Sequence, residues 1–203
     1  MSGYKYLFGP VPSRRLGASL GVSPIPERTC NYSCVYCQLG RTLRMTNTRQ
    51  EFFPLEEILA EFREYLRGSI PFDVVTVVGE GEPTLYSRLG ELIAGLKKET
   101  DKPVAVITNG ALLYDAEMRR ELMEADIVLP SLDAVTEEQY RKIDRPMGSI
   151  GFAEMAEGLR QFAREYQGQL WIEIMLVDGM NDSPEDIAAF KEFLGTIDYD
   201  RVY

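Results

Sequence analysis

Residues 30–37 read Cys30-Asn31-Tyr32-Ser33-Cys34-Val35-Tyr36-Cys37 and contain all three cysteines of the 203-residue chain, in the spacing C-x3-C-x2-C. Three thiolates on one short loop can bind three irons of a [4Fe–4S] cluster, which normally has four cysteine ligands. The chain offers no fourth cysteine and no histidine. One iron would therefore remain open to a small molecule that binds through nitrogen and oxygen. We interpret Cys30, Cys34 and Cys37 as metal ligands.

Three other interpretations of the cysteines remain open. A disulfide would leave one thiol over, and no amino-terminal signal peptide directs the chain to an oxidising compartment. A structural zinc site needs a fourth ligand, usually from a second C-x2-C pair or from histidines. The cysteines could also be small apolar side chains in the core, although this spacing would then be unusual.

The composition is that of an ordinary globular protein, with 45% hydrophobic and 27% charged residues. The length suffices for one sizeable domain with its own core. No apolar run approaches the roughly 20 residues that span a membrane, and reduced thiols fit the cytoplasm. We therefore expect a single domain over residues 1–203 that is soluble, cytoplasmic, monomeric and without membrane contact.

Charge is distributed unevenly along the chain. Residues 1–50 hold seven basic residues and one acidic residue, a net charge of +6, whereas the remaining 15 basic and 31 acidic residues give −16. The seven basic residues are Lys5, Arg14, Arg15, Arg28, Arg41, Arg44 and Arg49. A basic segment around the cysteines indicates an anionic partner such as RNA. Alternatively, these side chains are solvated or pair with the acidic remainder.

Strand and helix patterns alternate along the chain. Apolar, β-branched segments predict strands at 18–22, 73–78, 104–107, 126–129 and 171–177. Amphipathic segments predict helices at 54–66, 89–96, 115–124, 152–166 and 184–194. Proline and glycine density predicts an irregular extension over residues 1–17, and residues 200–203 resemble the start of a sixth strand. The predicted fold is α/β, a partial (β/α)6 barrel of parallel strands with outer helices and a truncated last strand.

A second motif, Gly79-Glu80-Gly81-Glu82-Pro83, follows the strand predicted at 73–78. Together with the cysteine spacing, it resembles the radical S-adenosylmethionine (radical SAM) superfamily, in which a similar loop grips the amino group of the cofactor. The resemblance implies two cofactors, a [4Fe–4S] cluster and S-adenosylmethionine. It also implies that Gly81 and Glu82 orient S-adenosylmethionine.

The resemblance suggests four further cofactor contacts, each with a plain structural alternative. Asn109 follows the third predicted strand and would bind the methionine moiety, or it is a turn residue before glycine. Ser131 and Asp133 follow the fourth predicted strand and would contact the ribose, although Asp133 could instead cap a helix. Tyr36 would touch the adenine or simply pack in the core.

By resemblance, reduced flavodoxin or ferredoxin delivers one electron, S-adenosylmethionine is cleaved, and a 5′-deoxyadenosyl radical abstracts hydrogen from a substrate. This is oxidoreductase chemistry in which the cofactors carry out the difficult step, and no residue stands out as a catalytic acid or base. The segments 8–17 and 37–41 are similar to stand-alone proteins related to wyosine-forming tRNA enzymes. Those enzymes use a second iron–sulfur cluster, for which this chain has no cysteines.

The substrate is open at this stage. The basic segment favours RNA such as tRNA, in which case binding would depend steeply on salt. A protein or peptide substrate is the alternative, including a glycyl-radical enzyme that the chain would activate. A third interpretation, from another class, is an iron–sulfur electron carrier or sensor that ignores S-adenosylmethionine.

Overall fold

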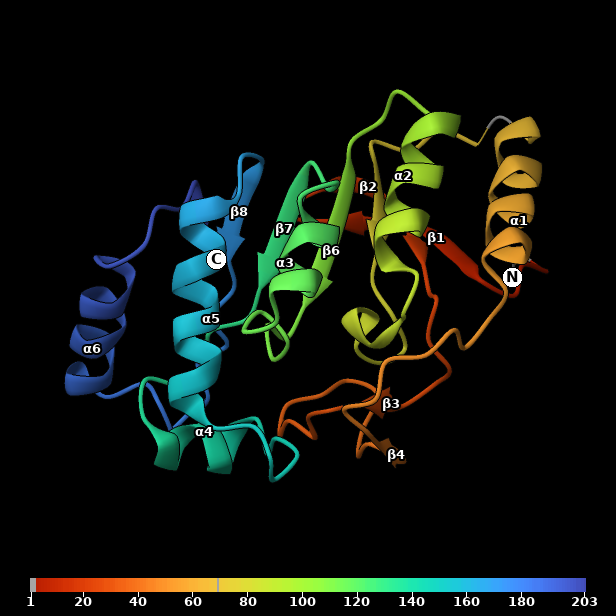
Figure 1. The fold of residues 1–203 in the computed structure, drawn as a ribbon. Coiled ribbons are helices and arrows are strands. Elements are labelled where there is room, and N and C mark those ends of the chain that lie inside the picture. Colours follow the sequence, from red (N-terminus) through yellow and green to blue (C-terminus); the bar gives the residue numbers. More distant parts are fainter. Residues whose placement is uncertain (1–2, 69) are drawn as a thin grey trace.

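A single β-sheet organises the chain in the computed structural model, which describes residues 3–68 and 70–203. Seven strands of these described residues form it: β1 Leu7–Ser13, β2 Gly17–Val22, β5 Val74–Val77, β6 Val104–Thr108, β7 Ile127–Pro130, β8 Gln169–Ile172 and β9 Arg201–Val202. Their order is β1-β2-β5-β6-β7-β8-β9 (Figure 1). All neighbours from β2 to β9 are parallel, and only β1 runs antiparallel to β2.

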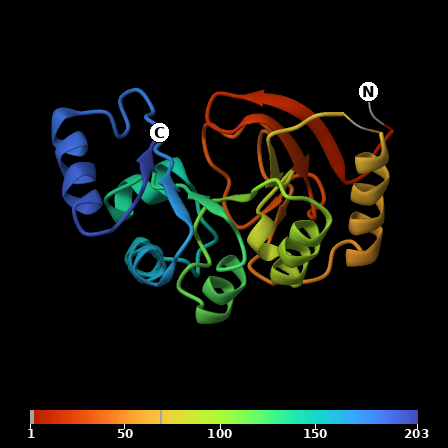
Figure 2. The same ribbon diagram turned by 90° about the horizontal axis from the view of Figure 1, so that it is seen from above.

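Helices cover the outer face of this sheet. They are α1 Leu55–Arg67, α2 Leu89–Glu99, α3 Ala116–Leu122, α5 Phe152–Glu165 and α6 Pro184–Leu194. Figure 2, a view from above, shows them arranged around the outside of a curved sheet. The predicted partial barrel of parallel strands with outer helices is confirmed. No helix of residues 3–68 and 70–203 is both long enough and apolar enough to cross a bilayer.

Alternation along the strands gives the sheet two different faces. Val75 and Val77 of β5 join the large core beneath the helices. Val74 points the other way and joins a small apolar cluster inside the barrel. That cluster consists of Leu16, Val74, Ala105, Ile127, Leu129 and Trp171. Thr76, also on the inner face of β5, lines a cavity next to this cluster. The inner face is therefore apolar in one part and polar in another.

The prediction of an irregular extension over residues 1–17 is wrong for the part that the structure describes, because Leu7–Ser13 forms strand β1. Proline lacks a ladder donor and is tolerated on edge strands and at bulges. β1 is an edge strand, and its register against β2 shifts between Phe8 and Val11. This irregularity accommodates Gly9 and Pro10.

Two other elements differ from the prediction. The strand expected at 171–177 ends at Ile172. Beyond it, the backbone makes an isolated bridge between Ser131 and Glu173 and a hydrogen bond from Ile174 N to Tyr203 O at 2.9 Å. Helix α4, Glu137–Ile143, was not predicted, because seven residues are too few for a clear apolar period. β9 lies where the sixth strand was expected to begin.

Candidate functional site

The cysteine loop leaves the short strand β3, Thr29–Cys30, which pairs in parallel with β4, Arg44–Met45. Two tight turns follow, in which Cys37 N donates to Cys34 O at 3.2 Å and Gly40 N donates to Cys37 O at 2.9 Å. All three cysteines are free thiols, partly exposed. Tyr32 N donates to Cys30 Sγ at 3.3 Å. The backbone therefore holds three thiols on one loop without a disulfide.

Helix α4 supports this loop from one side. Ser33 N and Val35 N donate to the carbonyl oxygens of Asp144 and Ile143 at 3.0 and 2.9 Å, at the end of α4. The hydroxyls of Tyr32 and Tyr140 lie 2.5 Å apart, both within the protein interior. The loop between Cys30 and Cys37 is thus fixed by backbone bonds to a helix more than 100 residues away in sequence.

The loop after β5 supports the cysteine segment from another side. Glu82 N donates to Thr29 O at 3.1 Å, and Thr29 bridges to Gly81. A β-carbon at Gly81 would overlap the carbonyl oxygen of Thr29 and lie 2.8 Å from Ile25 Cγ2. Glycine is therefore required here for the two backbones to approach each other.

The Glu82 carboxylate connects three loops. It is 2% exposed. Oε1 accepts from Thr84 N at 3.0 Å and from the hydroxyls of Thr84 and Thr108 at 2.6 Å each, and Oε2 accepts from Asn109 N at 2.8 Å. Burial raises the pKa of Glu82, while these donors favour the ionised form. Sequence reasoning did not anticipate that this carboxylate would accept so many hydrogen bonds from other residues of the chain.

Asn109 connects the end of β6 to the cysteines. Its Nδ2 donates to Asn31 Oδ1 at 2.7 Å and to Cys30 Sγ at 3.6 Å, and its Oδ1 accepts from Ala111 N at 2.9 Å. Gly110 follows with φ +76°. Asn109 is therefore a turn residue before glycine, as the structural alternative to cofactor binding predicted. It also lies next to the expected metal site.

Tyr36 and Asp133 contact each other. The Tyr36 hydroxyl donates to Asp133 Oδ2, and Met175 N donates to Asp133 Oδ1 at 2.7 Å. Asp133 does not cap α4, whose cap is Thr136. Burial raises the pKa of both Tyr36 and Asp133. Asp133 therefore orients Tyr36 and the segment after β8.

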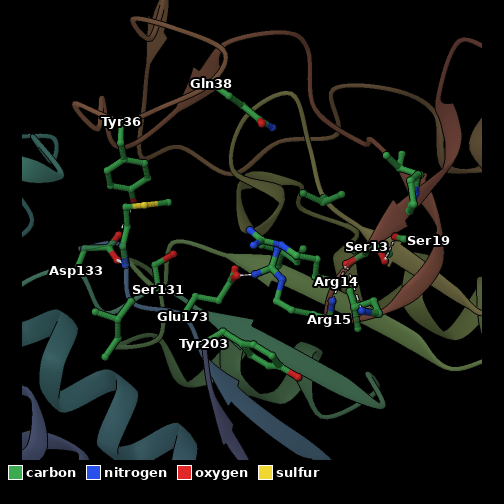
Figure 3. A pocket seen from close by; sticks show the side chains of 18 of the residues that line it. Ser13, Arg14, Arg15, Ser19, Tyr36, Gln38, Ser131, Asp133, Glu173 and Tyr203 are labelled. Carbon is green, nitrogen blue, oxygen red and sulfur yellow. Dashed lines mark hydrogen bonds and ion pairs between the residues drawn. The ribbon is translucent and has the colours of Figure 1, made fainter. Parts of the chain in front are cut away.

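A cavity of about 820 Å³ opens beside this pair on the inner face of the sheet (Figure 3). It is lined by Tyr36, Ser131 and Asp133, and by Gln38 just after the last cysteine. Ser13, Arg14, Arg15, Ser19, Thr76, Glu173 and Tyr203 contribute most of the other polar lining. A volume of this order matches sites for cofactors and small ligands.

Burial shapes the electrostatics around the thiols. It raises the pKa of Cys30 to about 12, with a further contribution from the negative charge of Glu82, and it also raises the pKa of Cys34. Asp144, only 4% exposed, accepts from Cys34 Sγ at 3.8 Å, and burial raises its pKa to about 8. An unliganded thiolate is therefore disfavoured at Cys30 and Cys34, and a positively charged partner would reverse that preference.

The donor set fits a cluster better than a single ion. Among residues 3–68 and 70–203, no three His, Cys, Asp or Glu side chains converge closely enough to hold one metal ion. In a [4Fe–4S] cluster each cysteine binds a different iron, so its thiolates need not converge on one point. Soft thiolates are the ligands that such clusters take, and the N–H groups of Tyr32 and Asn109 that face Cys30 are suited to tune the bound sulfur.

The structure groups the predicted site residues into two neighbouring sets. Cys30, Gly81, Glu82 and Asn109 form one connected set, and Tyr36, Ser131 and Asp133 line the cavity. Sequence reasoning missed Asn31, which is fully buried between Asn109 and Asn47. Its position inside the cysteine motif was the available signal.

The basic segment divides in the structure. Arg15 forms an ion pair with Glu173, and Arg49 forms one with Glu121 at 2.7 Å. These two pairs agree with the alternative prediction that basic residues of this segment pair with acidic residues of the remaining chain. Arg14 and Arg15 line the cavity, whereas Arg41 and Arg44 do not. The segment is therefore not one continuous free basic surface.

The structure is a partial parallel barrel with three free thiols on one loop, next to the carboxyl ends of β5 and β6. A family model described as the radical SAM superfamily matches residues 25–191. The chain therefore belongs to the radical SAM superfamily, a family of enzymes whose cofactors are a [4Fe–4S] cluster and S-adenosylmethionine.

Two curated relatives align over most of the chain. A protein of Brachyspira hyodysenteriae named GTPase Obg is 43% identical over 198 residues, which cover 98% of this chain and 29% of that protein. A UPF0026 protein of Synechocystis is 39% identical over 181 residues, which cover 89% of this chain and 68% of the relative. The chain thus spans less than a third of the Brachyspira protein. The relation to wyosine-forming enzymes stays a prediction.

Solved structures share the fold at low identity. A radical SAM methyltransferase from Sphaerobacter thermophilus superimposes with a TM-score of 0.68 at 17% identity, covering 91% of this chain and 55% of that one. A structure described as native anSMEcpe with bound AdoMet and Kp18Cys peptide gives a TM-score of 0.64 at 17% identity, covering 91% of this chain and 50% of the other. These likenesses establish the shared barrel.

Proposed function

We propose that Cys30, Cys34 and Cys37 hold a [4Fe–4S] cluster, and that the chain binds S-adenosylmethionine beside it to initiate hydrogen abstraction from a substrate in the adjoining cavity. The observation that carries this proposal is the connection from Cys30 through Asn109 to Glu82, which ties the thiols to the ends of β5 and β6. Superfamily membership supports the cofactor pair.

When bound, the cluster and S-adenosylmethionine would supply hydrogen abstraction: with one electron from a reduced flavodoxin or ferredoxin, S-adenosylmethionine would be converted to methionine and 5′-deoxyadenosine, the latter taking one hydrogen atom from the substrate. The residues of the chain bind and orient. Glu82 acts as a positioning residue, because its carboxylate fixes Asn109 and Thr108. Ser131 is our candidate for the ribose contact, and Tyr36 for the adenine contact, held by Asp133.

The experiment is anaerobic reconstitution with iron and sulfide, followed by reduction with dithionite in the presence of S-adenosylmethionine. We expect 5′-deoxyadenosine and methionine by mass spectrometry, and we expect Cys34→Ala to abolish both. The matched control is Ser33→Ala, which leaves every thiol in place. Clusters that form normally in the unchanged chain but yield no 5′-deoxyadenosine would instead support an electron carrier or sensor.

A further inference from the structure

A pair of adjacent arginines lines the cavity. Arg14 and Arg15 lie between β1 and β2, and Figure 3 shows both side chains near Glu173. Glu173 follows β8. This strand pairs with β9, the edge strand at the opposite end of the sheet from β1. Arg15 and Glu173 form an ion pair within the lining. The cavity is thus bounded by charged groups from two distant parts of the chain.

Local structure fixes where the arginines stand. Ser13 Oγ accepts from Arg15 N at 3.3 Å and from Leu16 N at 3.2 Å, which closes a turn around Arg14. Leu16 anchors the end of this turn in the apolar cluster inside the barrel. The arginine pair is therefore presented by an anchored turn.

The two arginines of the lining differ in their partners. Among the described residues, Arg15 has Glu173 as its partner, but no carboxylate lies within ion-pair distance of Arg14. Asp133, the other carboxylate of the lining, is bonded to the Tyr36 hydroxyl and to Met175 N. Burial, together with the neighbouring charge of Arg14, lowers the pKa of Arg15. Arg14 is thus the arginine of the lining without a carboxylate partner in the part of the chain that the structure describes, although the chain carries a net charge of −10.

The arginine pair also adjoins the residues assigned to S-adenosylmethionine. Glu173 N donates to Pro130 O at 3.0 Å, and Glu173 bridges to Ser131. Ser19 lies on β2 and Thr76 on the neighbouring strand β5. Ser19 Oγ and Thr76 Oγ1 lie 2.6 Å apart on the cavity wall. A ligand held by the arginines would therefore share one polar cavity with Ser131.

We propose that Arg14 and Arg15 bind an oxyanion, a phosphate or a carboxylate, that is carried by the substrate. Arginine is suited to both groups because its planar fork donates two parallel hydrogen bonds. A role limited to an ion pair would involve only Arg15 and Glu173, and would make no use of the charge of Arg14 in the lining of the same cavity. This assignment rests on the proposed function, since it specifies the substrate of the same cavity.

The test is isothermal titration calorimetry of the full chain, both as purified and after reconstitution with S-adenosylmethionine. The two probes are inorganic pyrophosphate and malonate, which separate the phosphate from the carboxylate. We expect saturable binding of at least one probe, weakened about tenfold by Arg14→Gln or Arg15→Gln, since a charge-assisted hydrogen bond is worth about that factor. Arg120→Gln is the control, because Arg120 is exposed on α3 outside the cavity.

Glu173→Gln distinguishes an anion site from a purely structural ion pair. Removing this carboxylate frees Arg15, so the anion should bind more tightly than to the unchanged chain. Binding of neither probe, or equal binding by the Arg14→Gln, Arg15→Gln and Arg120→Gln variants, would overturn the proposal. Failure of the proposed function would look different, since it would remove 5′-deoxyadenosine formation and leave these titrations unchanged.

Discussion

Gly81 determines how closely the cysteine loop approaches the carboxyl end of β5. Because a β-carbon there would meet Thr29 O and Ile25 Cγ2, Gly81→Ala must push the two loops apart. Overpacking of this kind costs about 1–3 kcal/mol. We expect urea unfolding to report that loss and the reconstituted cluster to be retained less well. Gly148→Ala is the control, because no atom lies within 4 Å of its added carbon, and an equal effect of both changes would argue against the assignment.

Glu82 is the other residue on which the site depends. Glu82→Gln replaces one carboxylate oxygen by an NH2 group. This group then faces an N–H or O–H group whose hydrogen bond the carboxylate had accepted. Leaving a buried polar group unpaired costs about 1–3 kcal/mol. We predict that this change lowers the free energy of unfolding by that amount and raises the KM for S-adenosylmethionine, because Asn109 loses its fixed position. Unchanged stability together with an unchanged KM would contradict the positioning role.

At the scale of elements, helix α4 is a support for the cysteine loop that the sequence did not reveal. The buried hydroxyls of Tyr32 and Tyr140 satisfy each other. Tyr140→Phe or Tyr32→Phe alone leaves one hydroxyl unpaired, at about 1–3 kcal/mol. The double change removes both groups, so we expect its cost to be well below the sum of the two single changes. A double-mutant cycle by urea unfolding checks this, and simple additivity would contradict the contact.

The elements show why the fold was predictable and some of its parts were not. The β-branched run at 73–78 predicts β5, because all four side chains of Val74–Val77 are buried on one face or the other. β1 was missed because Gly9, Pro10 and Pro12 signal irregular structure except on an edge strand, and edges are decided by the whole sheet. The range predicted for β8 extends too far, because the apolar run at 171–177 continues after the strand ends at Ile172.

For the whole molecule, the three-cysteine motif predicted the superfamily to which the chain belongs, while the cavity could be found only in the folded chain. Arg14, Thr76 and Glu173 are far apart in sequence and share no motif, yet they line one space. The net charge of +6 over residues 1–50 overstated the free basic surface, since Arg15 and Arg49 are ion-paired with Glu173 and Glu121. Such pairing depends on how distant segments meet.

The central claim is that three thiols bind an iron–sulfur cluster with one open iron. Iron and acid-labile sulfide should be assayed after anaerobic reconstitution, and the electron paramagnetic resonance spectrum of the reduced protein recorded with and without S-adenosylmethionine. We predict about four irons and four sulfides per chain, and a spectrum that changes when S-adenosylmethionine is added. About one zinc per chain without sulfide, or a cluster whose spectrum is indifferent to S-adenosylmethionine, would contradict the claim.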